Sequence, residues 1–190
     1  MGTSVNQRSP RTGPWDAVAA AYRNGSIPLD RTLQLVWRAA LREPGCNVKE
    51  LLISDGVMTC LEAALHYRTP AEALTGARAQ LAERKSMSFI ASIARRAAAL
   101  SCQADDPAAA FAANLFVQMT DYFVSRDLPS YVGAPYRNKG VSDAMEFKDR
   151  LRGMTCELLM PIATSPTLRA TEAWEAYVST ALKLLARTRL

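Results

Sequence analysis

The sequence contains a single histidine, His66, and four cysteines that form no CxxC pair. A structural zinc site needs Cys and His ligands at short spacings, so this pattern predicts no metal centre. The chain also lacks a glycine-rich phosphate loop, a GxSxG or HExxH motif, and an HxE followed by a cysteine pair. We therefore predict no metal, no cofactor and no enzymatic activity.

Two weaker catalytic interpretations rest on single residues. A nucleophilic cysteine such as Cys60 would need His66 as its base, but His66 stands near the end of a predicted helix. A structural imidazole that interacts with the helix dipole explains that position better. Two carboxylate pairs could serve as acid and base: Asp105 with Asp106, and Asp143 with Glu146. Both pairs stand at predicted helix starts, where capping of the backbone explains them more simply.

Long apolar runs are also missing, and no segment is continuous enough in its hydrophobicity to cross a bilayer. The first 13 residues are polar and contain no apolar signal segment, so we expect a mobile N-terminal tail over residues 1–13. Cys60 and Cys156 stand beside apolar helical neighbours, where a reduced thiol behaves as a small buried hydrophobe. These features predict a cytoplasmic protein without membrane contact.

Most of the sequence has the hydrophobic spacing of α-helices. Hydrophobic residues make up 49% and charged residues 22% of the sequence, which is the composition of a packed globule. Apolar residues recur at intervals of three and four, and no segment alternates as a strand does. Predicted helix starts lie near Pro14, Asp30, Asn47, Asp55, Thr69, Ser86, Asp106, Ser142 and Ser165. We predict an all-α, single-domain multi-helix bundle over residues 14–190, with a central helix over 108–124 and one long loop over 127–141.

Positive charge is the clearest functional signal. The net charge is +5 and the isoelectric point is about 9.2. Between residues 78 and 96 the only acid is Glu83, and the cations are Arg78, Arg84, Lys85, Arg95 and Arg96. The long loop adds Tyr131, Tyr136, Arg137 and Lys139. Fixed positive charge attracts polyanions and tyrosines stack on unpaired bases, so these residues form a candidate binding set for RNA or single-stranded DNA.

The same residues also have a structural interpretation. Arg and Lys can solvate helix faces, while Tyr131 and Tyr136 can anchor the loop to the core. The nucleic-acid hypothesis requires that the whole set converges on one continuous surface. The alternative is a helical protein–protein interaction module without nucleic-acid contact, and an enzyme that uses Cys60 or His66 ranks below both.

A compact helical chain with a basic ridge and no active site resembles the small, all-helical subunits of CRISPR ribonucleoprotein effectors. The residues that carry the resemblance are Arg78, Arg84, Lys85, Arg95, Arg96, Arg137 and Lys139. The resemblance implies a non-catalytic subunit of antiviral defence, stacked in copies among the protein subunits of a larger complex. It also implies that Arg and Lys contact the nucleic-acid backbone without reading bases.

Overall fold

The computed structural model describes residues 13–85, 88–134, 136–163, 168 and 170–187, and in these residues the chain folds into α-helices joined by short connections. The helices are α1 (Asp16–Arg23), α2 (Leu29–Leu41), α3 (Val48–Leu52), α4 (Asp55–His66), α5 (Pro70–Glu83), α6 (Phe89–Ser101), α7 (Pro107–Asp127), α8 (Val141–Leu159) and α9 (Thr171–Ala186). Two 3-10 turns follow α7 and α8, at η1 (Leu128–Tyr131) and η2 (Met160–Ile162). The predicted all-α multi-helix bundle is confirmed.

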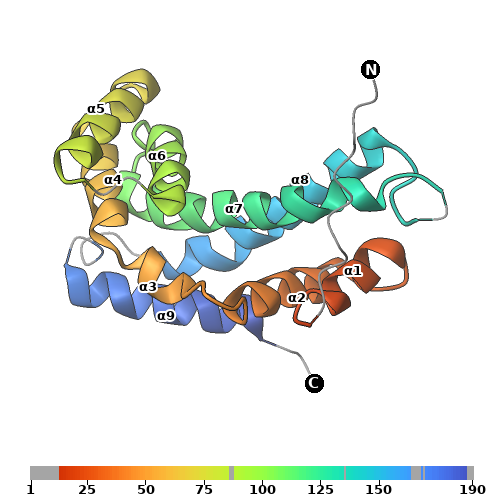
Figure 1. Cartoon of the computed structure of the whole chain (residues 1–190). Coiled ribbons are helices and arrows are strands. Elements are labelled where there is room, and N and C mark those ends of the chain that lie inside the picture. The colour runs from red at the N-terminus through yellow and green to blue at the C-terminus, as the bar shows by residue number, and fades with distance from the viewer. Residues whose placement is uncertain (1–12, 86–87, 135, 164–167, 169, 188–190) are drawn as a thin grey trace, which may run out of the picture.

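Helix α7 crosses the molecule and forms the centre of the packing (Figure 1). Its start was predicted from Asp106 and Pro107, and the Asp106 carboxylate accepts a hydrogen bond from the backbone N–H of Ala109 at 3.1 Å. Phe111, Leu115 and Met119 are fully buried because α7 packs against α4, α6, α8 and α2 on different sides. The predicted central helix is confirmed.

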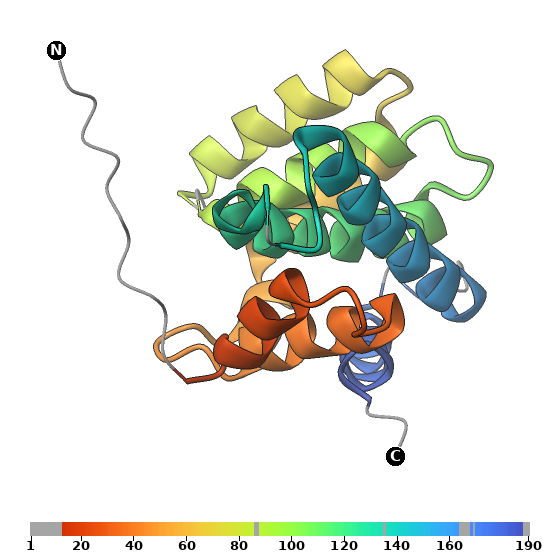
Figure 2. The ribbon, with the colours of Figure 1, turned by 90° about the vertical axis from the view of Figure 1, so that its right-hand side faces the viewer.

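The other helices form two groups around α7. Helices α4, α5 and α6 pack together at one end, whereas α1, α2, α3 and α9 lie on the opposite side of α7 (Figures 1 and 2). The N–H of the Trp37 indole donates to the Thr120 hydroxyl at 3.1 Å and connects α2 to α7. The Thr120 and Thr155 hydroxyls, also 3.1 Å apart, connect α7 to α8. A buried chain of polar groups thus fixes three helices relative to one another.

A side-chain cap begins four of the described helices, α3, α5, α6 and α7, whereas α4 begins after Ser54 without one although Asp55 was predicted to cap it. Asn47 accepts from the backbone N–H of Glu50, and Thr69 accepts from that of Glu72, each at 3.3 Å, as their sequence patterns predict. The prediction for α6 was less accurate, because the cap is Ser88, which accepts from the N–H of Ala91 at 3.2 Å. The predicted cap Ser86 lies outside the described residues, as do Ser165 and Pro166, the predicted start of the last helix.

The loop between α7 and α8 is shorter than predicted, because η1 occupies its first residues. The Gly133 N–H donates to the Asn138 carbonyl at 2.7 Å, with Gly133 at a φ of 104° that favours glycine. Helix α8 begins after Gly140, and the Asp143 carboxylate accepts from the backbone N–H of Lys139 at 3.0 Å.

None of the helices in the described part of the chain is both long and apolar enough to span a membrane.

Candidate interaction face

The predicted nucleic-acid-binding residues belong to two regions that lie far apart. Arg78, Arg84, Lys85, Arg95 and Arg96 come from α5, α6 and the connection between them, at one end of the molecule. Tyr131, Tyr136, Arg137 and Lys139 come from the loop at the other end (Figure 1). The single continuous surface that the nucleic-acid hypothesis requires is therefore not formed by this set.

The loop residues mostly pack against the protein itself. The Arg137 guanidinium donates to the Ile27 carbonyl at 2.9 Å and lies 4.7 Å from the centre of the Phe147 ring. Burial lowers the pKa of Arg137, and the nearby positive charge of Arg150 acts in the same direction. The Tyr131 ring packs against Tyr22 and Tyr136, with ring centres 5.8 and 5.7 Å apart. These contacts support the structural interpretation, in which the tyrosines anchor the loop.

Acidic residues balance the cations of the α4–α6 region. Residues 55–106 contain six Lys or Arg and six Asp or Glu. The cations are Arg68, Arg78, Arg84, Lys85, Arg95 and Arg96, and the acids are Asp55, Glu62, Glu72, Glu83, Asp105 and Asp106. Arg84 donates to the Thr59 hydroxyl at 3.0 Å and pairs with Glu62 at 3.4 Å. The positive excess of residues 78–96 is thus balanced in number by acids over the whole α4–α6 region, although Arg84 and Glu62 are the pair that lies in contact.

Arg95 and Arg96 are adjacent in sequence but point to different sides of α6, as a helical turn of about 100° per residue requires. Arg95 is half-buried on the side of Cys60, and Arg96 is exposed on the side of α7. Burial raises the pKa of the Cys60 thiol to about 12, while the charge of Arg95 acts against that rise. A thiol with this pKa is almost entirely protonated near neutral pH, which makes Cys60 a poor nucleophile.

His66 ends α4 and packs edge-on against Tyr67, with ring centres 4.9 Å apart. This position fits the structural role that the sequence favoured.

Within the described ranges, no group of three or more His, Cys, Asp or Glu residues is placed to hold a metal ion.

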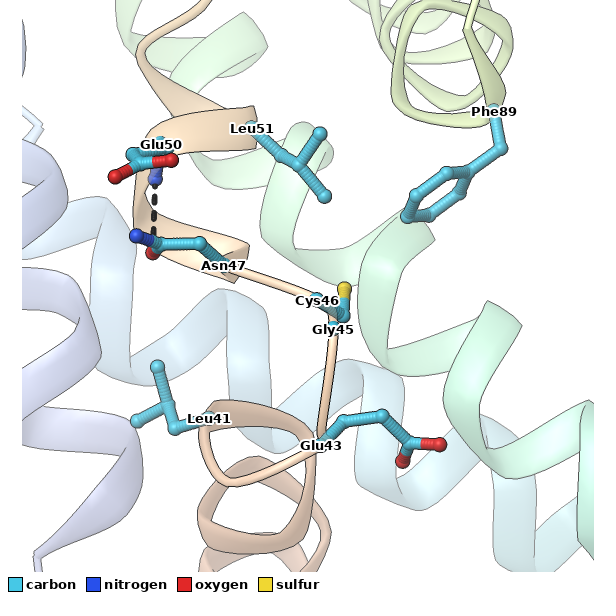
Figure 3. Close-up of a pocket in the computed structure, with 8 residues that line it drawn as sticks. All are labelled: Leu41, Glu43, Gly45, Cys46, Asn47, Glu50, Leu51 and Phe89. Carbon is cyan, nitrogen blue, oxygen red and sulfur yellow. Dashed lines mark hydrogen bonds between the residues drawn. The ribbon is translucent and has the colours of Figure 1, made fainter.

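An acidic pocket of about 900 Å³ lies between α6 and the segment that connects α2 to α3 (Figure 3). Leu51 and Phe89 extend toward one another above the Cys46 thiol. Glu43 and Glu50 also line the pocket, and none of the described residues that line it is Lys or Arg. The Glu50 carboxylate points away from Phe89 (Figure 3). This pocket therefore combines apolar surface with negative charge.

A second pocket, of about 800 Å³, lies between α6 and α7 and has the opposite character. Arg96 and Arg126 line it, and Asp121 is the one acid among its lining residues that the structure describes. The Asp121 carboxylate is already held by two cations of α8, with Lys148 at 3.2 Å and Arg152 at 3.8 Å. Arg126 is itself paired with Asp127 at 3.1 Å and with Glu43 at 4.0 Å. Arg96, which makes no ion pair among the described residues, therefore supplies the positive charge that this pocket presents.

The two pockets meet at an exposed aromatic pair. Phe89 lines the acidic pocket and Tyr122 the basic one, and each residue remains 41% exposed. Their ring centres are 5.5 Å apart, so they form a ridge between the pockets. Glu43 and Arg126, 4.0 Å apart, make a second link across the boundary. We call this surface the α6–α7 face; it comprises Leu41, Glu43, Glu50, Leu51, Phe89, Arg96, Tyr122 and Arg126.

The sequence analysis identified only Arg96 as a candidate on this face. Phe89, Ile93, Ala97 and Leu100 stand at three- and four-residue spacings that fit one apolar stripe of α6. Ile93 and Ala97 are buried, but Phe89 and Leu100 are 41% and 58% exposed because they lie at the two ends of the helix. The helical period identifies the face of a helix that is apolar, but not how far along the helix its neighbours extend.

No protein-family model, curated protein or solved structure matches this chain. The resemblance to CRISPR effector subunits therefore stays a prediction.

Proposed function

We propose that the chain is a non-catalytic helical module that binds a protein partner through the α6–α7 face. The observation that carries the proposal is the exposed Phe89–Tyr122 pair between an acidic and a basic pocket. Exposed aromatic residues surrounded by charged groups are typical of the centre and rim of protein interfaces. The four cysteines are free thiols, which fits a reducing cytoplasm.

The order of charge along the face favours a protein over a nucleic acid. A phosphate backbone carries negative charge along its whole length. If it ran from Arg96 across the aromatic pair, it would meet Glu43 and Glu50. A protein segment can instead place a cation against the acidic pocket, an apolar side chain on the ridge and an acid against Arg96.

A photo-crosslinking residue, benzoylphenylalanine, placed at Tyr122 of the full chain should yield a protein adduct in cells that naturally make this protein. The side chain at position 122 is exposed at the centre of the face, so a bound partner would lie within its reach. Mass spectrometry of the adduct identifies the partner. The purified partner should then bind the wild-type chain more tightly than the Phe89→Ala variant.

The same crosslinker at Leu100 is the matched control. Leu100 is more exposed than Tyr122, and it lies about 17 Å from Phe89 along the axis of α6. We expect no specific adduct there. Equal adducts at both positions, or adducts at neither, would contradict a partner on the α6–α7 face.

A second candidate is binding of RNA or single-stranded DNA backbone within a larger ribonucleoprotein assembly. It is favoured by Arg78, Lys85 and Arg96, which are exposed and make no ion pair among the residues that the structure describes. A fluorescence-anisotropy titration with single-stranded RNA and DNA over a series of salt concentrations tests it. Steeply salt-dependent binding, weakened by Arg78→Glu with Lys85→Glu, would support this candidate. Absence of binding near physiological salt would exclude it.

A further inference from the structure

We propose that the partner on the α6–α7 face is a second copy of this chain, related to the first by a two-fold axis through the Phe89–Tyr122 ridge. This inference rests on the proposed function and names its partner. A two-fold interface brings the same surface of both copies together, so the surface must be complementary to itself.

The α6–α7 face has that property because its charges change sign across the aromatic ridge. Glu43 and Glu50 lie on one side and Arg96 and Arg126 on the other. A two-fold rotation about the ridge exchanges the two sides. The acidic pocket of one copy then faces the basic pocket of the other, twice per dimer, and the aromatic pairs of both copies meet at the centre.

One charged residue of each pocket, Glu50 or Arg96, is available for this contact. Glu43 and Arg126 already interact with each other and with neighbours inside the chain, since Trp15 donates to Glu43 and Asp127 lies 3.1 Å from Arg126. Glu50 and Arg96 make no ion pair within the described ranges. In the dimer each Glu50 would therefore pair with the Arg96 of the other copy.

The apolar part of the face supports the same contact. Leu41, Phe89 and Tyr122 are among the large apolar side chains that the fold leaves exposed, at 37%, 41% and 41%. Each belongs to the face or to its ridge. Contact with a second copy would remove this apolar surface from water, which is the main favourable contribution to association.

Sedimentation equilibrium of the purified full chain and two charge-reversal variants tests the inference. The wild-type chain should form a dimer. Arg96→Glu and Glu50→Lys should each raise the dissociation constant of the dimer at least about tenfold, because each places two like-charge contacts in the interface. An equimolar mixture of the two variants should regain dimerisation, since the introduced Glu and Lys then face one another.

Arg150→Glu is the control, because it makes the same change of charge on the exposed side of α8 near Arg137. It should leave the dimer unchanged. Recovery in the mixture also excludes misfolding, because a misfolded variant would not regain a partner. A wild-type monomer throughout, or a dimer that neither variant weakens, or a mixture without recovery would overturn the inference.

The photo-crosslink separates this inference from the proposed function. An adduct at Tyr122 with twice the mass of the chain and only its peptides agrees with a second copy. An adduct with a different protein would retain the proposed function and overturn the dimer.

Discussion

Replacing Trp37 by alanine should lower the free energy of unfolding by about 3–5 kcal/mol, the usual range for truncating a large buried aromatic residue. Trp37 is fully buried in α2, and its ring lies between Phe116 and Phe123 of α7, with ring centres 5.5 and 5.6 Å away. Removing the indole would leave a cavity where the α2 side of the molecule packs on the central helix. It would also remove the donor that reaches Thr120.

Urea denaturation followed by circular dichroism would measure the effect. Trp37→Phe is the matched variant, because it keeps a six-membered aromatic ring and loses the five-membered part of the indole with its N–H. The Thr120 hydroxyl would still have Thr155 at 3.1 Å, so we expect a smaller loss of about 1–2 kcal/mol for this variant, from the small cavity and the lost hydrogen bond. A loss below about 1 kcal/mol for Trp37→Ala would mean that α2 does not depend on this contact with α7.

The helices were predictable because their signals are local. Asn47, Thr69 and Asp106 each cap a helix through a backbone N–H only three residues away, so the relevant chemistry is contained in a few consecutive letters. Trp174, Val178 and Leu185 stand at helical spacings of four and seven residues and are all buried on one side of α9. The cap of α6 was predicted less well, because Ser86 and Ser88 both satisfy the capping pattern and the pattern does not choose between them.

The candidate face could not be predicted in the same way, because it depends on distances between helices. Glu62 pairs with Arg84 across 22 positions of sequence, and the guanidinium of Arg137 reaches Ile27 across 110 positions. A count of charges along the chain therefore overestimates the free positive charge. The sequence also could not show that Phe89 and Tyr122 meet at the surface, because each residue fits an apolar helical stripe and would be expected to be buried.

Replacing Arg126 by methionine should lower the free energy of unfolding by about 2–4 kcal/mol, because removing one partner of a largely buried ion pair leaves the other charge without its counter-charge. The Arg126 side chain is only 14% exposed. Its guanidinium lies 4.1 Å from the centre of the Trp15 ring, 3.1 Å from Asp127 and 4.0 Å from Glu43. It thereby holds α1 and the end of α2 against α7. Methionine keeps the apolar stem, so the loss reports mainly on charge and stacking.

Arg126→Lys should recover only part of this stability, because an ammonium group restores the charge but neither the planar stacking on Trp15 nor the forked geometry of the guanidinium. Arg96→Met is the comparison within the same pocket. Arg96 is exposed and has no ion-pair partner in the described part of the chain, so its loss should change stability by no more than about 0.5 kcal/mol. Urea denaturation of the three variants under one set of conditions measures the difference. The structure implies that Arg126 stabilises the fold and that Arg96 is left for a partner. Equal losses of unfolding free energy for Arg96→Met and Arg126→Met would contradict this division of roles.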